Sequence, residues 1–454
     1  MDEAIRFEGY WWLPGANDNV VPGILEFDPD KGASLRLMGS LQGLEGITDP
    51  HEPEIIHGLS SDGKLITLKD CGQTLGDLRF GSGFSTSAYA ANTIFVGRHF
   101  ERPEDVGFKS LIVEYLYLEA WADSSGFDIK FVEEEREPKE HRIEVKHELP
   151  AAAAARVGGE YGVTLDFGSD FKASQRPFTW ATIKQPAELV IEFSGKQPFV
   201  RLSDIVFRLQ HLLSLGLRRS AYPVAIRGYT GAREQTMPVE VYYSPLGRMD
   251  GVKRPERFEM LYSRKDLPGG FETAVARWLE RAGSLDPVYR LFLGTVYNPR
   301  SYLEQRFLRL VQAVEVYHRR ALYVSDLPEE DHKKRVEEIL DSAPVEHKIW
   351  LRRKLRVVSE PSLDERLHVV LKRHRGIANS VVGTKGEARA EFVQKVVATR
   401  NYQTHFDDNK KDKAARGEEL HHVARQLKLL LEACLMEEIG FGPEETRDAV
   451  LGTR

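Results

Sequence analysis

Hydrophobic residues in the last third of the chain recur three and four positions apart, which is the spacing of one face of an α-helix. The pattern is clearest in residues 302–322, in a segment that begins near residue 384, and in residues 418–438. It predicts three amphipathic helices whose apolar faces pack together. The residues expected to be buried are Phe307, Leu310, Val311, Val314, Phe392, Val393, Val396, Val397, Leu420, Val423, Leu427, Leu430, Leu431, Cys434 and Leu435.

Signals for helix ends accompany this pattern. Ser362 and Glu365 have the S/T-x-x-E spacing of a capping box, as do Thr384 and Glu387, so we expect a helix to begin at each pair. Gly440 follows the last apolar position, where a glycine commonly ends a helix. Shorter helices are predicted over residues 271–282, 287–293, 329–341, 345–357 and 364–375.

The first half of the chain shows a different pattern, in which short apolar alternations are separated by turns such as Asp28-Pro29-Asp30-Lys31-Gly32. Alternation with a period of two predicts β-strands, and their regular spacing favours a sandwich or a barrel-like sheet. One helix interrupts the strands, and Ser203 is expected to cap it. The predicted strands include residues 35–38, 65–68, 93–96, 111–116, 162–167, 188–193 and 239–243.

Together these patterns predict an α+β multidomain protein, with a β-rich, sandwich-like N-terminal domain followed by an all-α helical bundle. We expect the N-terminal domain in residues 1–268, a helical connector in residues 269–298 and the helical domain in residues 299–454. A length of 454 residues suits two or three domains.

Composition indicates the cellular compartment in which the protein works. No apolar run approaches the ~18 residues that a membrane helix requires, and the acidic start Met1-Asp2-Glu3 lacks an apolar signal region. With Cys71 and Cys434 as the only cysteines, a disulfide framework is not expected, which suits a reducing compartment. We therefore expect a cytoplasmic protein without a membrane partner.

Charge is unevenly distributed along the chain. The formal net charge is −6, yet Lys and Arg outnumber Asp and Glu by 29 to 26 from Leu291 onward. A mildly basic C-terminal part fits an RNA partner. Solvated helix faces would give the same count, so both interpretations stay open.

The candidate chemistry lies in Thr399-Arg400-Asn401-Tyr402-Gln403-Thr404-His405, at the mouth of the predicted helical hairpin. Arg-x4-His also occurs at Arg136, Arg142 and Arg416, but only Arg400 is followed by Asn and preceded by an apolar helix. On an ideal helix, residues five apart lie ~140° apart around the axis. We therefore expect the helix to end or loosen near Asn401, so that His405 swings back toward Arg400.

This segment resembles the HEPN superfamily of small helical domains, many of which are metal-independent ribonucleases with an R-N-x-x-x-H signature. The resemblance covers roughly residues 302–441 and includes the helix Phe307-Leu308-Arg309-Leu310-Val311-Gln312-Ala313-Val314-Glu315. The opening Gly9-Tyr10-Trp11-Trp12-Leu13-Pro14 is similar to the N-terminal domain found with ApeA-type HEPN proteins. The resemblance implies bacterial defence against phage by RNA cleavage.

The resemblance also implies roles for individual residues. RNA carries its own nucleophile, the 2′-hydroxyl, so cleavage needs a proton-transfer group such as His405 and a cation such as Arg400. Asn401 would orient a neighbour, and neither a metal ion nor another cofactor is expected. In the family two such motifs face each other across a dimer, so a homodimer or a higher homo-oligomer is expected.

Glu315 and Tyr402 could support the site, and each has two possible interpretations. Glu315 either holds Arg400 by a bidentate ion pair or is an ordinary exposed glutamate. Tyr402 either stacks on a base or lies at the edge of the core.

Three hypotheses for the function of the whole chain stay open. The first hypothesis is an endoribonuclease that is released by an unknown phage-derived or host trigger, with the N-terminal domain sensing that trigger. The second is a catalytically inactive module that binds RNA and dimerises. The third makes the β-domain a carbohydrate or peptide binder that uses Trp11 and Trp12.

Overall fold

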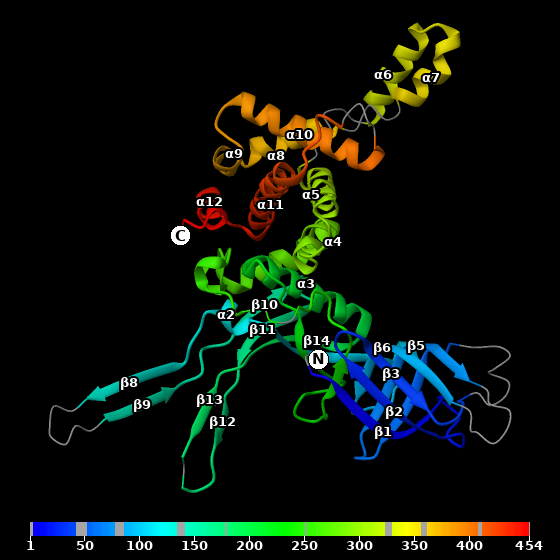
Figure 1. The fold of residues 1–454 in the computed structure, drawn as a ribbon, viewed down its shortest axis with the longest axis vertical. Coiled ribbons are helices and arrows are strands. Elements are labelled where there is room, and N and C mark those ends of the chain that lie inside the picture. Colours follow the sequence, from blue (N-terminus) through cyan, green and yellow to red (C-terminus); the bar gives the residue numbers. More distant parts are fainter. Residues whose placement is uncertain are drawn as a thin grey trace. The chain divides into compact units, whose positions relative to one another are not determined.

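The chain divides into two compact units, Met1–Glu280 and Arg281–Arg454. The computed structural model describes residues 3–41, 52–77, 86–133, 141–177, 179–249, 251, 253–322, 329–355, 361–406 and 411–453. The first unit is built mainly from strands and the second from helices, as the sequence pattern predicts (Figure 1).

A sheet of 12 strands forms the framework of the first unit, in the order β10-β11-β14-β7-β15-β16-β6-β3-β2-β1-β4-β5. Strand β5 also pairs with β6, so the strands β6-β3-β2-β1-β4-β5 close into a barrel. The strands are β1 (Ile5–Trp12), β2 (Val21–Asp28), β3 (Gly32–Leu37), β4 (Ile55–Ser60), β5 (Leu65–Asp77), β6 (Thr86–Val96), β7 (Gly107–Tyr115), β10 (Ala153–Val157), β11 (Tyr161–Phe167), β14 (Ala187–Pro198), β15 (Pro223–Tyr229) and β16 (Val239–Tyr242). The seven strands predicted above all lie within these elements, to within one residue at their ends.

The barrel interior is filled by alternate side chains of its strands, and Trp11 is fully buried among them. Trp11 lies opposite Gly58 in the antiparallel pair of β1 and β4. A Cβ atom at Gly58 would overlap the indole ring, so only glycine fits beneath it. The closed ring leaves the barrel strands fully paired around their circumference, which removes the exposed edges of an open sheet.

The remaining strands are covered by helix α3 (Phe199–Leu217), which packs against β7 and β14. The Tyr115 hydroxyl donates a hydrogen bond of 2.7 Å to the carbonyl of Val206 and fixes this packing. Ser203 does not cap α3, because the helix begins at Phe199 and the Ser203 hydroxyl donates to the carbonyl of Val200. The capping prediction at Ser203 was therefore wrong, since apolar residues extend the helix upstream of it.

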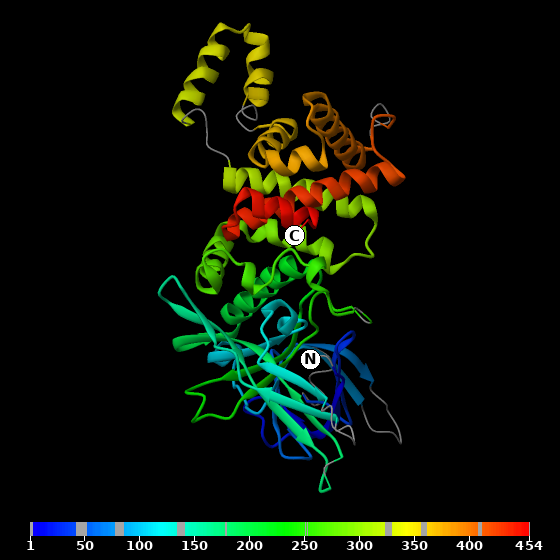
Figure 2. The same cartoon turned by 90° about the vertical axis from the view of Figure 1, so that its left-hand side faces the viewer.

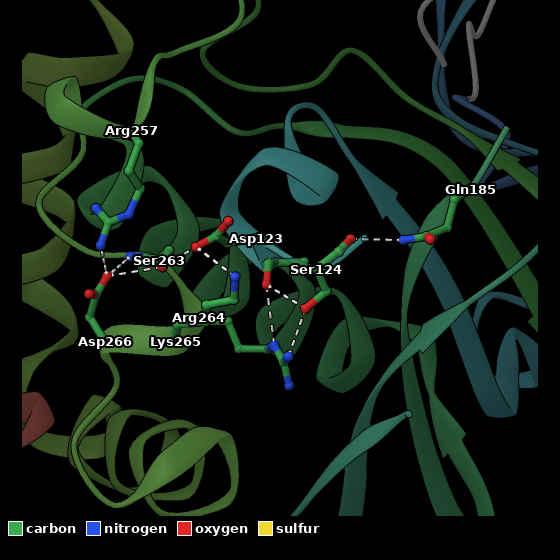
Figure 3. A network of polar contacts seen from close by, with 9 residues as sticks. Asp123, Ser124, Gln185, Arg257, Ser263, Arg264, Lys265 and Asp266 are labelled. Atoms are coloured by element: carbon green, nitrogen blue, oxygen red, sulfur yellow. Dashed lines mark hydrogen bonds and ion pairs between the residues drawn. The ribbon is translucent and has the colours of Figure 1, made fainter. Parts of the chain in front are cut away.

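Two β-hairpins project from the first unit (Figure 1). One pairs β8 (Phe127–Glu133) with β9 (His141–His147), and the other pairs β12 (Asp170–Ala173) with β13 (Ala181–Lys184). Their bases are joined by Gln185, whose amide donates to the carbonyl of Ser124 at 2.9 Å and accepts from the amide of Gly126 at 2.8 Å. Arg264 adds a bond of 2.7 Å to the Ser124 hydroxyl, so a polar network fixes both bases to the body of the unit (Figure 3).

The helices of the second unit follow from the apolar spacing described above. They are α5 (Leu303–Tyr317), which continues as a π-helical turn (His318–Leu322), then α6 (Glu329–Ser342), α7 (Val345–Leu355), α8 (Leu363–Arg373), α9 (Arg375–Val381), α10 (Gly386–His405), α11 (Gly417–Ile439) and α12 (Pro443–Leu451). The expected pair of connector helices is instead one helix, α4 (Gly270–Tyr297), which contains Pro287 and the boundary between the units.

Helices α5 and α11 form the centre of the second unit, and α8, α9, α10 and α12 surround them (Figure 2). Fourteen of the fifteen residues predicted to be buried are buried, and Val397 is half-buried at the edge of α10. Helices α6 and α7 pack on each other, and α7 contributes no buried residue.

In the second unit, helix ends agree with the sequence signals at two positions and differ at one. Ser362 caps α8 with the reciprocal bonds of a capping box, and Gly440 ends α11 with φ = 117°. Thr384 does not cap α10, because the helix begins one residue later than the box requires and Lys385 occupies the N-cap without a side-chain bond. That prediction was wrong.

A polar cluster ties three helices to the C-terminal end of α11. The Glu438 carboxylate accepts a bond of 2.8 Å from Arg281 and one of 3.2 Å from the Tyr317 hydroxyl. The neighbouring Glu437 accepts a bond of 2.8 Å from Arg373. Burial raises the pKa of the Tyr317 hydroxyl, so this side chain is a neutral hydrogen-bond donor.

Candidate active site

The candidate residues lie on the last turns of α10. This helix runs without interruption from Gly386 to His405, and Phe406 ends it in the left-handed conformation with φ = 51°. The expectation that the helix ends or loosens near Asn401 was wrong. No Pro and no internal Gly interrupts residues 387–405, so the backbone hydrogen bonds continue to the end.

The continuous helix determines which side chains share a face. Asn401 and His405 are four residues apart and therefore lie within ~40° of each other around the axis. Tyr402 lies ~60° from His405 on the far side from Asn401, whereas Arg400 lies ~140° away. Among the residues that the structure describes, no hydrogen bond or ion pair joins Arg400 to His405.

Arg400 is held by two acceptors and is partly exposed. Its guanidinium donates to the Asn401 side-chain oxygen at 3.2 Å, and its Nη2 atom lies 3.8 Å from Glu315 Oε1 on α5. This contact is a single ion pair and not the bidentate pair that we considered for Glu315. One third of the Arg400 side chain, 34%, remains exposed, so its guanidinium is oriented and still accessible to an anion.

A buried arginine, Arg366, contacts the backbone of Glu315. The Arg366 side chain on α8 is 5% exposed, and its Nη1 atom donates to the backbone carbonyl of Glu315 at 3.1 Å. Its Nε atom donates to the carbonyl of Pro361 at 2.7 Å. Arg366 was missed in the sequence, where the only signal is a charged residue beside the apolar positions Leu367 and Val370.

The two ends of the connection between α10 and α11 are held together at the site. The Thr399 hydroxyl is fully buried, donates to the carbonyl of Lys395 at 2.7 Å and accepts from the amide of Ala415 at 2.8 Å. This bond brings Arg416, the N-cap residue of α11, beside the end of α10. Residues 407–410, between α10 and α11, lie outside the described residues.

Three side chains form an aromatic and cationic surface next to His405. The Arg416 guanidinium carbon lies over the Tyr402 ring, 5.1 Å from its centroid, and the Phe406 ring centroid lies 6.1 Å from that of Tyr402. His405 and Phe406 are exposed, and Tyr402 is half-buried. In the sequence Arg416 matches Arg-x4-His but is not followed by Asn, and Phe406 gives no signal.

Other chemically active groups are less suited to a site. Burial raises the pKa of the Cys434 thiol well above its usual value, so Cys434 is not a nucleophile at neutral pH. Trp11 is buried in the barrel, and Trp12 is half-buried with its ring edge-on to His57 and His99, which leaves no exposed Trp pair for a sugar or a peptide. The described residues contain no group of three or more His, Cys, Asp or Glu placed to hold a metal ion.

Comparison with known families covers most of the chain. The family described as ApeA N-terminal domain 1 matches residues 6–278, and the family described as Apea-like HEPN matches residues 308–445. Neither a curated protein nor a solved structure is similar enough to count as a match. In the described part of the chain, no helix is long and apolar enough to cross a membrane.

Proposed function

Because the chain belongs to the ApeA-like HEPN family, we propose that it is an endoribonuclease that requires no metal ion and acts in defence against phage. The observation that carries the proposal is the end of α10. There an oriented, partly exposed arginine and an exposed histidine supply the cation and the proton-transfer group that phosphodiester cleavage needs. The cut RNA would be the host's or the phage's.

The proposed reaction uses the 2′-hydroxyl of RNA as its nucleophile. A base removes the 2′-hydroxyl proton, the 2′-oxygen forms a bond to phosphorus, and the bond from phosphorus to the 5′-oxygen breaks as that oxygen is protonated. His405 is the proton-transfer group, because imidazole exchanges protons near neutral pH. Arg400 stabilises the added negative charge on the phosphorane with a planar guanidinium. The products are a 2′,3′-cyclic phosphate and a 5′-hydroxyl.

Asn401 and Glu315 are positioning residues in this proposal. Asn401 accepts a hydrogen bond from Arg400 and shares the helix face of His405, so it connects the two groups. Glu315 tethers the guanidinium to α5 without neutralising it by a close bidentate pair. Tyr402 is half-buried next to the proton-transfer group, and its proposed role is to support the contact with a base.

The geometry of α10 supports a composite centre made by two copies of the chain. Within one copy Arg400 and His405 point ~140° apart, so one phosphate would reach both only with difficulty. A two-fold pair would place Arg400 of one copy near His405 of the other and give two equivalent centres. The active species would then be a homodimer or a larger assembly built from it.

The first unit has the proposed role of sensing a trigger or restraining the nuclease. A fragment that tests this division should start at Arg281, because a start at residue 299 removes Arg281 from the Glu438 carboxylate that it pairs with. The catalytically inactive adaptor remains the competing function. A cytoplasmic location is part of the same proposal.

Incubation of the purified full chain with total RNA in EDTA tests the proposal. With an extract of phage-infected bacteria added as a source of trigger, we expect more fragmentation with the wild type than with Arg400→Ala. Arg425→Ala, which changes an exposed arginine on α11, is the matched control and should cleave normally. Intact RNA with the wild type, in the presence of a cell extract from phage-infected bacteria as a source of trigger, would favour the adaptor.

A further inference from the structure

Phe406 occupies a position that folding stability does not explain. The residue is 74% exposed, and its backbone is left-handed with φ = 51° and ψ = 35°. Its amide donates to the carbonyl of Tyr402 at 2.6 Å and closes the last turn of α10. Glycine or asparagine usually fills such a position, because a bulky side chain is strained there. Backbone strain of this kind gathers at functional sites.

The surroundings of Phe406 are those of a stacking surface. The Tyr402 ring lies 6.1 Å from it with an interplanar angle of 68°, and the Arg416 guanidinium covers the Tyr402 ring at 5.1 Å. Tyr402 is therefore fixed between its neighbours while the Phe406 face is open. Both aromatic residues lie beside His405, the first at ~60° around the helix and the second adjacent in the chain.

Cleavage by the 2′-hydroxyl requires the nucleotides at the scissile phosphate to unstack, and this surface can stabilise an unstacked base. The attacking 2′-oxygen, the phosphorus and the leaving 5′-oxygen must align, and a base-paired A-form helix does not allow that alignment. The nucleotides on either side of the phosphate must therefore unstack. An unstacked base loses stacking energy, which an aromatic side chain can restore.

We infer that Phe406, supported by Tyr402 and Arg416, is a stacking subsite for an unpaired base next to the scissile phosphate. This inference rests on the proposed function and names its substrate class, which is single-stranded RNA or an unpaired loop. Stacking contacts the face of a base and not its edges, so the subsite accepts every base and holds purines more firmly than pyrimidines. Arg416 and Arg400 supply positive charge for the neighbouring phosphates.

A second copy of the chain is the competing occupant of Phe406, because a dimer interface would also cover an exposed ring. The two occupants make opposite predictions. If a base covers Phe406, its removal weakens RNA binding and leaves the oligomeric state unchanged. If the partner copy covers it, its removal lowers the oligomeric state measured by light scattering.

The test uses a single-stranded oligonucleotide that contains 2-aminopurine and has 2′-deoxy sugars at every position, so it cannot be cut. Stacking quenches 2-aminopurine, and we expect saturable quenching by the wild-type full chain. Phe406→Ala should weaken the affinity about tenfold and reduce the quench, since one stacked base is typically worth that much. Phe406→Trp should restore both, and a fully paired duplex should give little quenching.

Two variants separate stacking from folding. Phe258→Ala removes the ring of a first-unit residue that is 79% exposed, and it should bind like the wild type. Phe406→Gly relieves the left-handed strain, so it should melt no lower than the wild type and still lose the affinity. Unchanged binding by Phe406→Ala, or a change only in its oligomeric state, would overturn the inference.

The same assay distinguishes the two proposals. His405→Ala should lose RNA cleavage and keep the quenching, because it removes proton transfer and not stacking. A wild type that quenches the probe through Phe406 and never cuts RNA would contradict the endoribonuclease and leave the subsite standing. A wild type that cuts RNA while Phe406→Ala binds and cuts equally well would contradict the subsite alone.

Discussion

Arg400 and Glu315 lie on two different helices, and their side chains approach to 3.8 Å between Nη2 and Oε1. The distance is longer than a hydrogen bond, so the carboxylate orients the guanidinium and leaves its N–H donors available. Arg366 donates a hydrogen bond to the backbone carbonyl of Glu315. The site is thus supported by a chain of contacts that runs from α8 through α5 to α10.

Changing Glu315 to Gln tests this orientation. The substitution keeps the size of the side chain and removes the charge that attracts Arg400, so we expect kcat for RNA cleavage to fall about tenfold with little increase in KM. Glu304→Gln, at an exposed position of the same helix, is the control and should cleave normally. Wild-type kcat in Glu315→Gln would show that Arg400 needs no tether.

The two capping-box sequences should differ in their effect on stability. Ser362→Ala removes the side-chain bond to the amide of Glu365 and should lower the free energy of unfolding by about 1 kcal/mol. Thr384→Ala removes no cap and should change it by less than ~0.5 kcal/mol. Urea unfolding followed by far-ultraviolet circular dichroism measures both. Equal losses would mean that Thr384 caps α10 in solution.

His99 should make the first unit sensitive to acid. Burial lowers the pKa of its ring below the ordinary value of 6.5, an effect that its hydrogen bond to the Gly58 carbonyl opposes and that the stacked His57 ring reinforces. The unfolded chain then binds a proton more readily than the folded one. This stability is present above about pH 6.5 and is lost as the pH falls below it.

The measurement is the melting temperature at about pH 7.5 and about pH 5.5, on either side of the ordinary histidine pKa. His99→Gln keeps a donor for the Gly58 carbonyl and cannot gain the proton, so its acid-induced drop should be smaller than that of the wild type. His368→Gln, on an exposed face of α8, is the control and should leave the drop unchanged. A drop of the same size in His99→Gln would assign the acid sensitivity to other groups.

The sequence predicted structural relationships between residues that are near one another in the chain. Leu310 and Val314 share a face because they are one helical turn apart, and no distant contact is needed to infer it. The strand at Ala153–Val157 carried no signal because its alanines favour no strand by themselves. The pairing of Ile66 with Val96, which closes the barrel, joins strands whose hydrogen bonds leave no local pattern.

The candidate site shows the same limit. The motif residues were singled out from their order, and the break expected at Asn401 came from requiring Arg400 and His405 to meet within one copy. The helix has no residue that would break it. Arg416 was missed because it meets Tyr402 only after the Thr399 hydroxyl has joined the two ends of the connection. Phe406 was missed because α10 continues past the expected break and places its ring beside Tyr402.

A composite centre predicts complementation between two inactive proteins. Mixing Arg400→Ala with His405→Ala, under conditions that exchange subunits, forms hybrids in which one copy keeps His405 and the other keeps Arg400. One of the two centres in each hybrid is then complete, so RNA cleavage should return to a fraction of the wild-type rate. Light scattering on the wild type supplies the control. Active monomers, together with a silent mixture, would contradict the composite centre.

The chemistry of the cut ends tests the central claim most directly. A defined single-stranded RNA is incubated in EDTA with the wild type, with His405→Ala and with His368→Ala, which removes a similarly exposed histidine outside the site. We expect 2′,3′-cyclic phosphate or 3′-phosphate ends from the wild type and from His368→Ala, and no cleavage by His405→Ala. Ends with a 3′-hydroxyl, or cleavage by His405→Ala at the wild-type rate, would contradict the account.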